Sequence, residues 1–76
     1  MRRNDMDMDR MVALAFLADF GAVTYRGVEI NRSRVWGWDL KDVETGKVTV
    51  TNDALFALHL VDLLRDKGID WFEEAA

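Results

Sequence analysis

Residues 22–51 read AVTYRGVEINRSRVWGWDLKDVETGKVTVT, and their apolar and polar side chains alternate with the period of two that is typical of β-strands. The first apolar members form two alternating pairs, Val23 with Tyr25 and Val28 with Ile30. Gly27 lies between the pairs and permits a bulge, so we predict one bent strand over about residues 22–31. A tight hairpin at Arg26 and Gly27 is the alternative, and the pattern does not distinguish the two.

Two more strands are expected after a turn at residues 31–33. One carries alternating Trp36, Trp38 and Leu40, and the other carries alternating Val48 and Val50. Residues 44–46 form a short hairpin loop between them, with Gly46 at the position that needs a positive φ. We expect these tryptophans and valines to share one face and pack in the core, in a three-stranded antiparallel meander.

A helix is predicted on each side of this meander. The first covers about residues 5–20, with Asn4, Asp5 and Asp7 suited to its start and Gly21 to its end. The second is capped by one of residues 51–53, runs to about Lys67 and stops at Gly68. The expected fold class is therefore α+β, in the order α-β-β-β-α, with residues 1–76 forming a single domain.

Composition bears on the location of the protein. Half of the 76 residues are hydrophobic and 32% are charged, which favours a folded unit over a disordered acidic tail. The absence of cysteine excludes disulfides and thiolate metal sites, and favours a reducing cytoplasm. The longest apolar run, residues 11–18, is too short to span a bilayer. We therefore expect a cytoplasmic protein with no membrane segment.

The charge pattern bears on the partner. The net charge is -4, and residues 53–76 carry six acidic and two basic groups. The chain also has one cluster of basic residues, which consists of Arg26, Arg32 and Arg34. Three clustered arginines are too few to favour direct nucleic-acid binding, and the acidic C-terminal quarter would repel a phosphate backbone. The same acidic quarter suits a basic surface on another protein.

No residue constellation supports catalysis or metal binding. Asp5, Asp7 and Asp9 have the spacing of a calcium loop, but Arg10 and Phe16 stand where that loop needs glycine and glutamate. His59 and Asp62 lack a second histidine or a cysteine to complete a metal site. Ser33, the only serine, has no nucleophile motif around it. We expect no enzyme activity, no metal and no cofactor.

The last helix offers a candidate contact surface. Leu55 and Leu58 fall among its polar residues, where a solvated face has no use for them. Alternatively, residues 69–72 fold back and cover both leucines. With the exposed charges that follow, the predicted protein-binding residues are Leu55, Leu58, Asp62, Asp66, Asp70, Glu73 and Glu74.

The first helix suggests self-association, because its apolar residues surround most of the helix axis and only one other helix is available to cover them. We expect a homodimer through Met11, Leu14, Leu17 and Ala18. The alternative is a monomer in which Trp71 and Phe72 cover that side.

Two resemblances bear on function. The predicted element order is that of double-stranded-RNA-binding domains, but residues 52–54 read NDA where that family has a lysine-rich motif, so none of its functional residues carries over. Trp36 and Trp38 could stack bases as the aromatic sheets of other RNA binders do, although core packing is the better account. The segments YRGVEI at 25–30 and WGW at 36–38, then Gly46 and the Ala/Leu-rich helix from Ala54, resemble short phage and prophage proteins, among them anti-CRISPR inhibitors.

That second resemblance covers about residues 23–67 and implies a binder that blocks a host complex, with no site residues supplied. We expect a non-enzymatic, acidic protein-binding module. The alternative is a small self-associating structural or assembly subunit.

Overall fold

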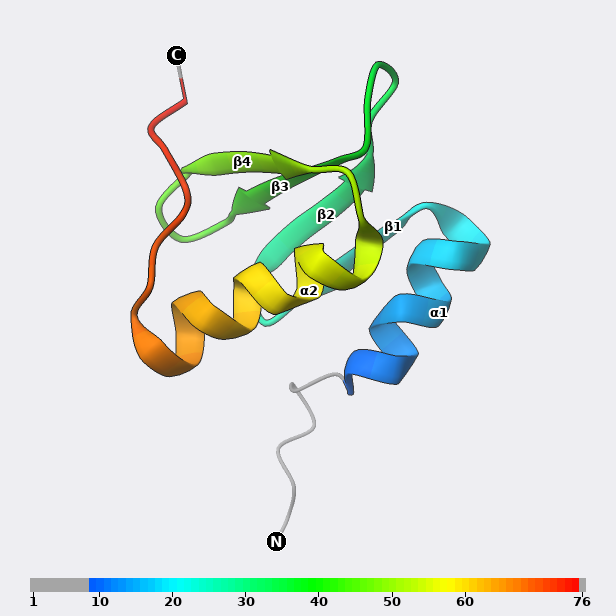
Figure 1. The fold of residues 1–76 in the computed structure, drawn as a ribbon, viewed down its shortest axis with the longest axis horizontal. Helices are drawn as coiled ribbons and strands as arrows, with labels where there is room; N and C mark the ends of the chain where they lie inside the picture. The colour runs from blue at the N-terminus through cyan, green and yellow to red at the C-terminus, as the bar shows by residue number, and fades with distance from the viewer. Residues whose placement is uncertain (1–8, 76) are drawn as a thin grey trace, which may run out of the picture.

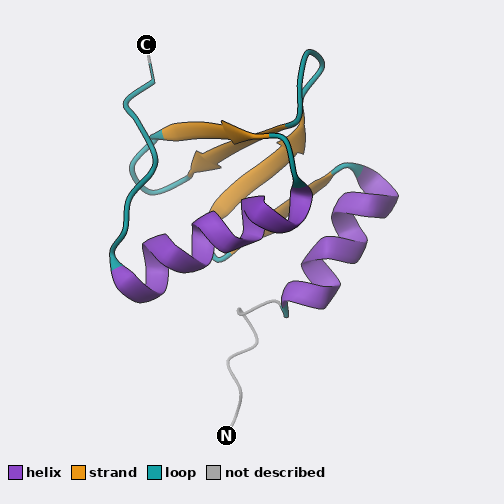
Figure 2. Ribbon diagram, in the orientation of Figure 1, coloured by secondary structure: helices purple, strands orange, loops and turns teal. Residues whose placement is uncertain are grey.

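The strands of the computed structural model, which describes residues 9–75, form one antiparallel sheet in chain order, β1-β2-β3-β4. Both helices lie on one face of this sheet (Figure 1), and Figure 2 shows the resulting two layers. The elements are α1 (Arg10–Phe20), β1 (Ala22–Tyr25), β2 (Val28–Arg32), β3 (Trp38–Asp42), β4 (Val48–Thr51), α2 (Ala54–Asp62) and a π-helical extension, η1 (Leu63–Lys67). The α+β class is confirmed. No helix within residues 9–75 has the length and apolar character needed to cross a membrane.

The sheet has four strands because residues 22–32 form a hairpin. Arg26 and Gly27 have φ values of 50° and 82°, as a tight turn between antiparallel strands requires, and Tyr25 pairs directly with Val28. The predicted bent strand is wrong, and the alternative hairpin is correct.

β3 begins later than predicted. Trp38 and Leu40 are buried as expected, but Trp36 lies exposed in the preceding loop. The Ser33 hydroxyl accepts hydrogen bonds from the backbone N–H groups of Val35 and Trp36, both at 3.1 Å, and so bends the chain away from an extended path. Trp36 therefore does not continue the alternation of the strand.

β4 turns its valines away from the core. Leu40 pairs with Thr49 and Trp38 with Thr51, and paired residues of antiparallel strands point to the same face. The threonines therefore face the helices, and Val50 is 55% exposed on the other face. The expectation that Val48 and Val50 share the core face was wrong by one residue of register.

α1 begins at Arg10 instead of near residue 5. Asp9 is extended, with φ -63° and ψ 143°, and its carboxylate accepts a 3.3 Å hydrogen bond from the Met11 N–H. The predicted capping residues Asn4, Asp5 and Asp7 lie outside the described residues. Gly21 ends the helix in the left-handed conformation, with φ 72°, as predicted.

α2 and η1 together have the limits predicted for the last helix. Asp53 caps it by accepting a 2.8 Å hydrogen bond from the Phe56 N–H, and Gly68 ends η1 with φ 69°. The helix contributes Ala57, Leu58, Leu60 and Val61 to the buried core. They pack with Ala13 and Leu17 of α1, with Phe72, and with the inner face of the sheet: Val23, Tyr25, Val28, Ile30, Trp38 and Leu40.

Candidate functional site

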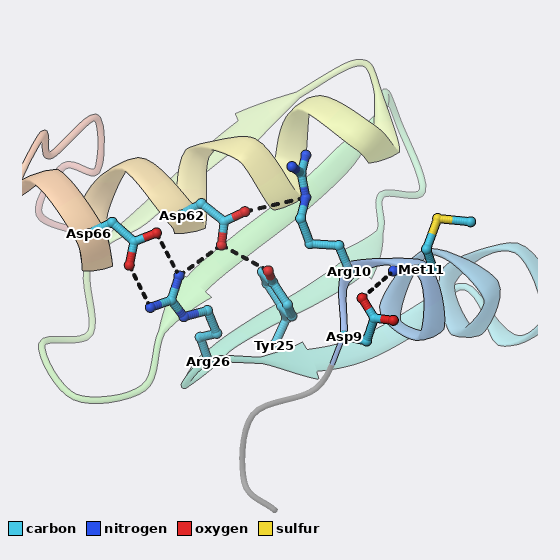
Figure 3. A network of polar contacts seen from close by, with 7 residues as sticks. All are labelled: Asp9, Arg10, Met11, Tyr25, Arg26, Asp62 and Asp66. Carbon is cyan, nitrogen blue, oxygen red and sulfur yellow. Dashed lines mark hydrogen bonds and ion pairs between the residues drawn. The ribbon is translucent and has the colours of Figure 1, made fainter. Parts of the chain in front are cut away.

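Asp62, at the end of α2, joins three elements through its carboxylate (Figure 3). Its Oδ1 accepts hydrogen bonds from the Tyr25 hydroxyl at 2.8 Å and from Arg26 Nη1 at 2.9 Å. Its Oδ2 lies 3.3 Å from Arg10 Nε. Because the Asp62 side chain is only 18% exposed, these contacts fix α2 against α1 and the β1–β2 hairpin.

Arg26 extends this network to Asp66, because its guanidinium donates two hydrogen bonds, of 2.8 and 3.2 Å, to the Asp66 carboxylate. The hydrogen bond to Asp66 is the main cause that raises the pKa of Arg26, and the same bond lowers the pKa of Asp66. Burial, followed by the hydrogen bond to Asp62, raises the pKa of Tyr25 to about 12. Tyr25 therefore stays a neutral donor at physiological pH, and the network positions α2 with its charges paired internally.

Arg65 fastens η1 to the sheet. Its Nε donates a 2.8 Å hydrogen bond to the Arg26 carbonyl, and its Nη2 lies 3.1 Å from Oδ1 of the buried Asp42. Asp62 and Arg65 thus hold the C-terminal part of the α2–η1 helix against the β1–β2 hairpin and β3.

The C-terminal segment is fixed at the start of β4, which it crosses in Figure 1. Glu73 and Val48 exchange two backbone hydrogen bonds, of 2.8 and 2.9 Å. Asp70 accepts a hydrogen bond from the Phe72 N–H at 2.9 Å and another from Lys47 Nζ at 3.1 Å. The first of these, then the second, lowers the pKa of Asp70. Because Phe72 is buried in the core, this segment forms a firm wall beside β4.

An apolar groove of about 440 Å³ lies between α2, β4 and the C-terminal segment. Val50, Phe56 and Trp71 line it and are 55%, 48% and 60% exposed. The remaining lining residues are Thr49, His59, Leu60, Leu63 and Glu73. We call this set the α2 groove.

A second hollow prolongs the α2 groove. It shares Phe56 and His59 with the groove and continues to Leu55 and Arg10. The rings of Phe56 and His59 lie 5.8 Å apart between the two hollows. The exposed side chains of Leu55 and Phe56 thus extend the apolar surface towards the start of α2, where Arg10 and Asp53 border it.

Only part of the predicted protein-binding set lies on this surface. Leu55 is exposed beside the groove, Glu73 lines it and Glu74 is exposed next to it. Leu58 is fully buried in the core, so its predicted exposure is wrong. The alternative cover by residues 69–72 fails for Leu55, which is 51% exposed, whereas Leu58 is buried in the same core cluster as Phe72.

The three aspartates of the set are engaged elsewhere. Asp62 and Asp66 point towards Arg26, and Asp70 pairs with Lys47. The predicted exposure of Asp62 is wrong, because its side chain is paired with Arg26 and only 18% exposed. Phe56 lines the groove although it was not among the predicted contact residues, whereas Leu58, which helix periodicity placed among the polar residues, is buried.

α1 presents a separate apolar face. Met11, Val12, Phe16 and Phe20 are exposed, and the rings of Phe16 and Phe20 meet edge to face at 5.7 Å. Of the predicted dimer contacts, Met11 and Ala18 are exposed, Leu14 is half-buried and Leu17 is fully buried. Trp71 and Phe72 do not cover this face, because their segment lies at β4 (Figure 1).

The predicted arginine cluster is divided by the sheet. Arg26 lies in the β1–β2 turn, whereas Arg32 and Arg34 lie at the other end of β2. The Arg32 guanidinium stacks on the Trp38 ring, 4.6 Å from its centroid. Residues 9–75 contain no group of three or more side chains that could hold a metal ion. No family model matches the chain, and no curated protein or solved structure is significantly similar to it.

Proposed function

We propose that this chain is a non-enzymatic protein-binding module that receives an apolar segment of another protein in the α2 groove. The observation that carries the proposal is the convergence of Phe56 and Trp71, each about half exposed, on one groove that the edge of β4 borders at Val50. Tryptophan is among the side chains that dominate binding energy at protein interfaces, and anchored walls reduce the entropy lost on binding.

Charge favours a basic neighbourhood on the partner. Glu73 is the one charged residue that lines the groove, and Glu74 follows it on the surface. A carboxylate at the rim attracts lysine or arginine beside the bound segment and disfavours acidic partners and nucleic acid. The resemblance to phage-encoded inhibitors extends the proposal: the partner is a cytoplasmic host complex whose basic surface is blocked.

Two groove variants test the binding proposal. Phe56→Asp and Trp71→Asp each place a carboxylate in the groove, and Val35→Asp is the control because Val35 is 93% exposed in the β2–β3 loop. With each protein as bait in a host extract, we expect wild type and the control to retain one host protein in fixed stoichiometry and both groove variants to lose it. Retention by the folded groove variants would reject this surface.

A plating assay tests the inhibitor proposal. Expression of the wild-type chain in a host with active CRISPR immunity is expected to restore plaques of a targeted phage, with Val35→Asp retaining and Phe56→Asp losing the effect. A wild-type chain that leaves immunity intact rejects inhibition of that system and leaves the binding assay to stand on its own.

Self-association is the second candidate function, and the exposed face of α1 favours it. Four large apolar side chains on an 11-residue helix are more than a solvated helix face needs. A symmetric dimer would bury Val12, Phe16 and Phe20, which lie on one side of α1 at a spacing of four residues, against their own copies. Because the α1 face and the α2 groove lie on different elements, variants can test the two candidates separately.

A further inference from the structure

The edge of β4 beside the α2 groove carries free backbone groups. The Asp42 N–H donates to the Lys47 carbonyl at 2.9 Å, which makes residue 47 a hydrogen-bonded position opposite β3. Hydrogen-bonding direction alternates along a strand, so Val48 and Val50 direct their N–H and C=O groups to the outer edge. Glu73 satisfies those of Val48, and within residues 9–75 no backbone group pairs with those of Val50.

The groove lies directly beside this open position. A strand added next to Val50 would place the side chain opposite Val50 on the outer face of the sheet. Its two neighbours would lie beside Thr49 and Thr51, which face the helices, and would therefore point towards the groove residues of α2. Glu73 limits the length of such a strand, because it already occupies the position opposite Val48.

From this geometry, and resting on the proposed function, we infer that the partner segment binds as a short extended strand added to the edge of β4. The segment pairs with Val50 through two backbone hydrogen bonds. Its apolar side chains alternate, two of them entering the α2 groove, and a lysine or arginine follows at the end that meets Glu73 and Glu74. Strand addition supplies affinity through the backbone and specificity through alternate side chains.

Charge and size fit this occupant. The end of the groove at Glu73 is acidic, and Lys47 nearby is already paired with Asp70 at 3.1 Å. A cavity of about 440 Å³ lies at the low end of the range for binding pockets, which suits a few side chains and not a whole helix. Because the added strand would pair with β4 only at Val50, an isolated peptide is expected to bind weakly.

The test uses the full chain and three synthetic peptides. The probe is acetyl-Lys-Phe-Val-Leu-Lys-amide, in which Phe and Leu are the groove side chains and the central Val faces Val50. The first control carries an N-methyl group on that central Val and so lacks one hydrogen-bond donor. The second control has Glu at both ends. Titration of the ¹⁵N-labelled protein is followed by the amide of Val50, its hydrogen exchange and the Trp71 indole signal.

We expect the probe to shift the signals of Val50 and Trp71 and to slow exchange of the Val50 N–H by roughly tenfold at saturation. The N-methyl control should bind about five- to tenfold more weakly, as loss of one hydrogen bond predicts. The Glu control should also bind more weakly, and by less at high salt. In the protein, Val50→Pro removes the free donor without breaking the ladder to β3 and should weaken binding of the probe strongly. Val50→Thr keeps the backbone N–H and should weaken binding much less than Val50→Pro.

Two results would overturn the inference, and both are separable from failure of the proposed function. Shifts at Trp71 with unchanged exchange at Val50 and equal binding of the N-methyl peptide would mean that the groove binds segments, but not as strands. No shift at either position with millimolar probe would reject a strand of this composition. The bait experiment with Phe56→Asp and Trp71→Asp reads the groove independently of any peptide.

Discussion

The Tyr25 hydroxyl on β1 donates a 2.8 Å hydrogen bond to the carboxylate of Asp62 at the end of α2. The same carboxylate oxygen accepts a hydrogen bond from Arg26 in the adjoining turn. The other carboxylate oxygen lies 3.3 Å from Nε of Arg10 in α1. One carboxylate thus connects the hairpin to both helices. Asp62 therefore helps to hold the helix that forms the α2 groove, and its replacement should lower the free energy of unfolding.

Charge reversal at Asp62 and at Asp66 should have different effects on the free energy of unfolding. Asp62→Lys leaves the Tyr25 hydroxyl and Arg26 without their acceptor in a side-chain environment only 18% exposed, so we expect a loss of about 2–4 kcal/mol in the free energy of unfolding. Asp66→Lys, at an exposed position, should shift the urea midpoint little. Equal midpoints for the two variants would contradict the role of Asp62.

Stability should fall at alkaline pH because of Tyr25. Its pKa in the folded chain is about 12, above the ordinary value of 10, so the unfolded chain loses the proton first. The contribution is complete below pH 10 and disappears as the pH rises to about 12, and the shift corresponds to roughly 2–3 kcal/mol.

Tyr25 is the only tyrosine, so its ionisation can be followed by tyrosinate absorbance. Chemical denaturation of wild type and Tyr25→Phe across this range provides the control. The variant should lose the tyrosine part of the alkaline slope, and an identical slope in both proteins would refute the assignment.

The neighbouring leucines of α2 should differ sharply on truncation. Leu58→Ala empties a fully buried position and should cost about 2–5 kcal/mol. Leu55→Ala removes a side chain that is half exposed and should change the unfolding free energy by less than about 1 kcal/mol. Urea titrations measure both, and a larger loss for Leu55 would mean that the helix is rotated from the observed orientation.

Self-association should depend on the exposed face of α1. If the dimer forms, light scattering at micromolar concentration gives twice the 8.7 kDa chain mass, and Phe16→Glu or Phe20→Glu returns it to one chain mass. Val35→Glu, on a separate loop, is the matched control and should leave the mass unchanged. Leu17→Glu should unfold the chain, because Leu17 is fully buried. A wild-type mass of 8.7 kDa at every concentration would exclude the dimer.

Local chemistry in the sequence determined where most elements stop and turn. Gly21 and Gly68 end the helices, and Gly46 has φ 78° in the β3–β4 loop, since each position needs a left-handed backbone that glycine adopts at low cost. Asp53 caps α2 through its own side chain. Such signals act within a few residues, and they can therefore be interpreted without knowing the rest of the fold.

The hairpin at Arg26 marks the limit of that approach. Alternation on both sides of Gly27 fits either a bulge or a turn, and only pairing of Tyr25 with Val28 decides between them. A non-glycine residue with φ 50° is tolerated there because Arg26 is held by Asp62 and Asp66, which are 36 and 40 residues away. No local pattern contains that information.

The candidate site depended on tertiary structure for the same reason. Periodicity predicted an amphipathic α2, but packing against α1 and the sheet decides its rotation, which buries Leu58 and exposes Phe56. The register of β4 against β3 turns Val50 outward, and the return of Glu73 to Val48 places Trp71 beside it. The sequence by itself determined the inventory of apolar and acidic side chains and the limits of the elements. Which of those side chains meet at one surface was decided by contacts between distant segments, because register and helix rotation are set by mutual packing.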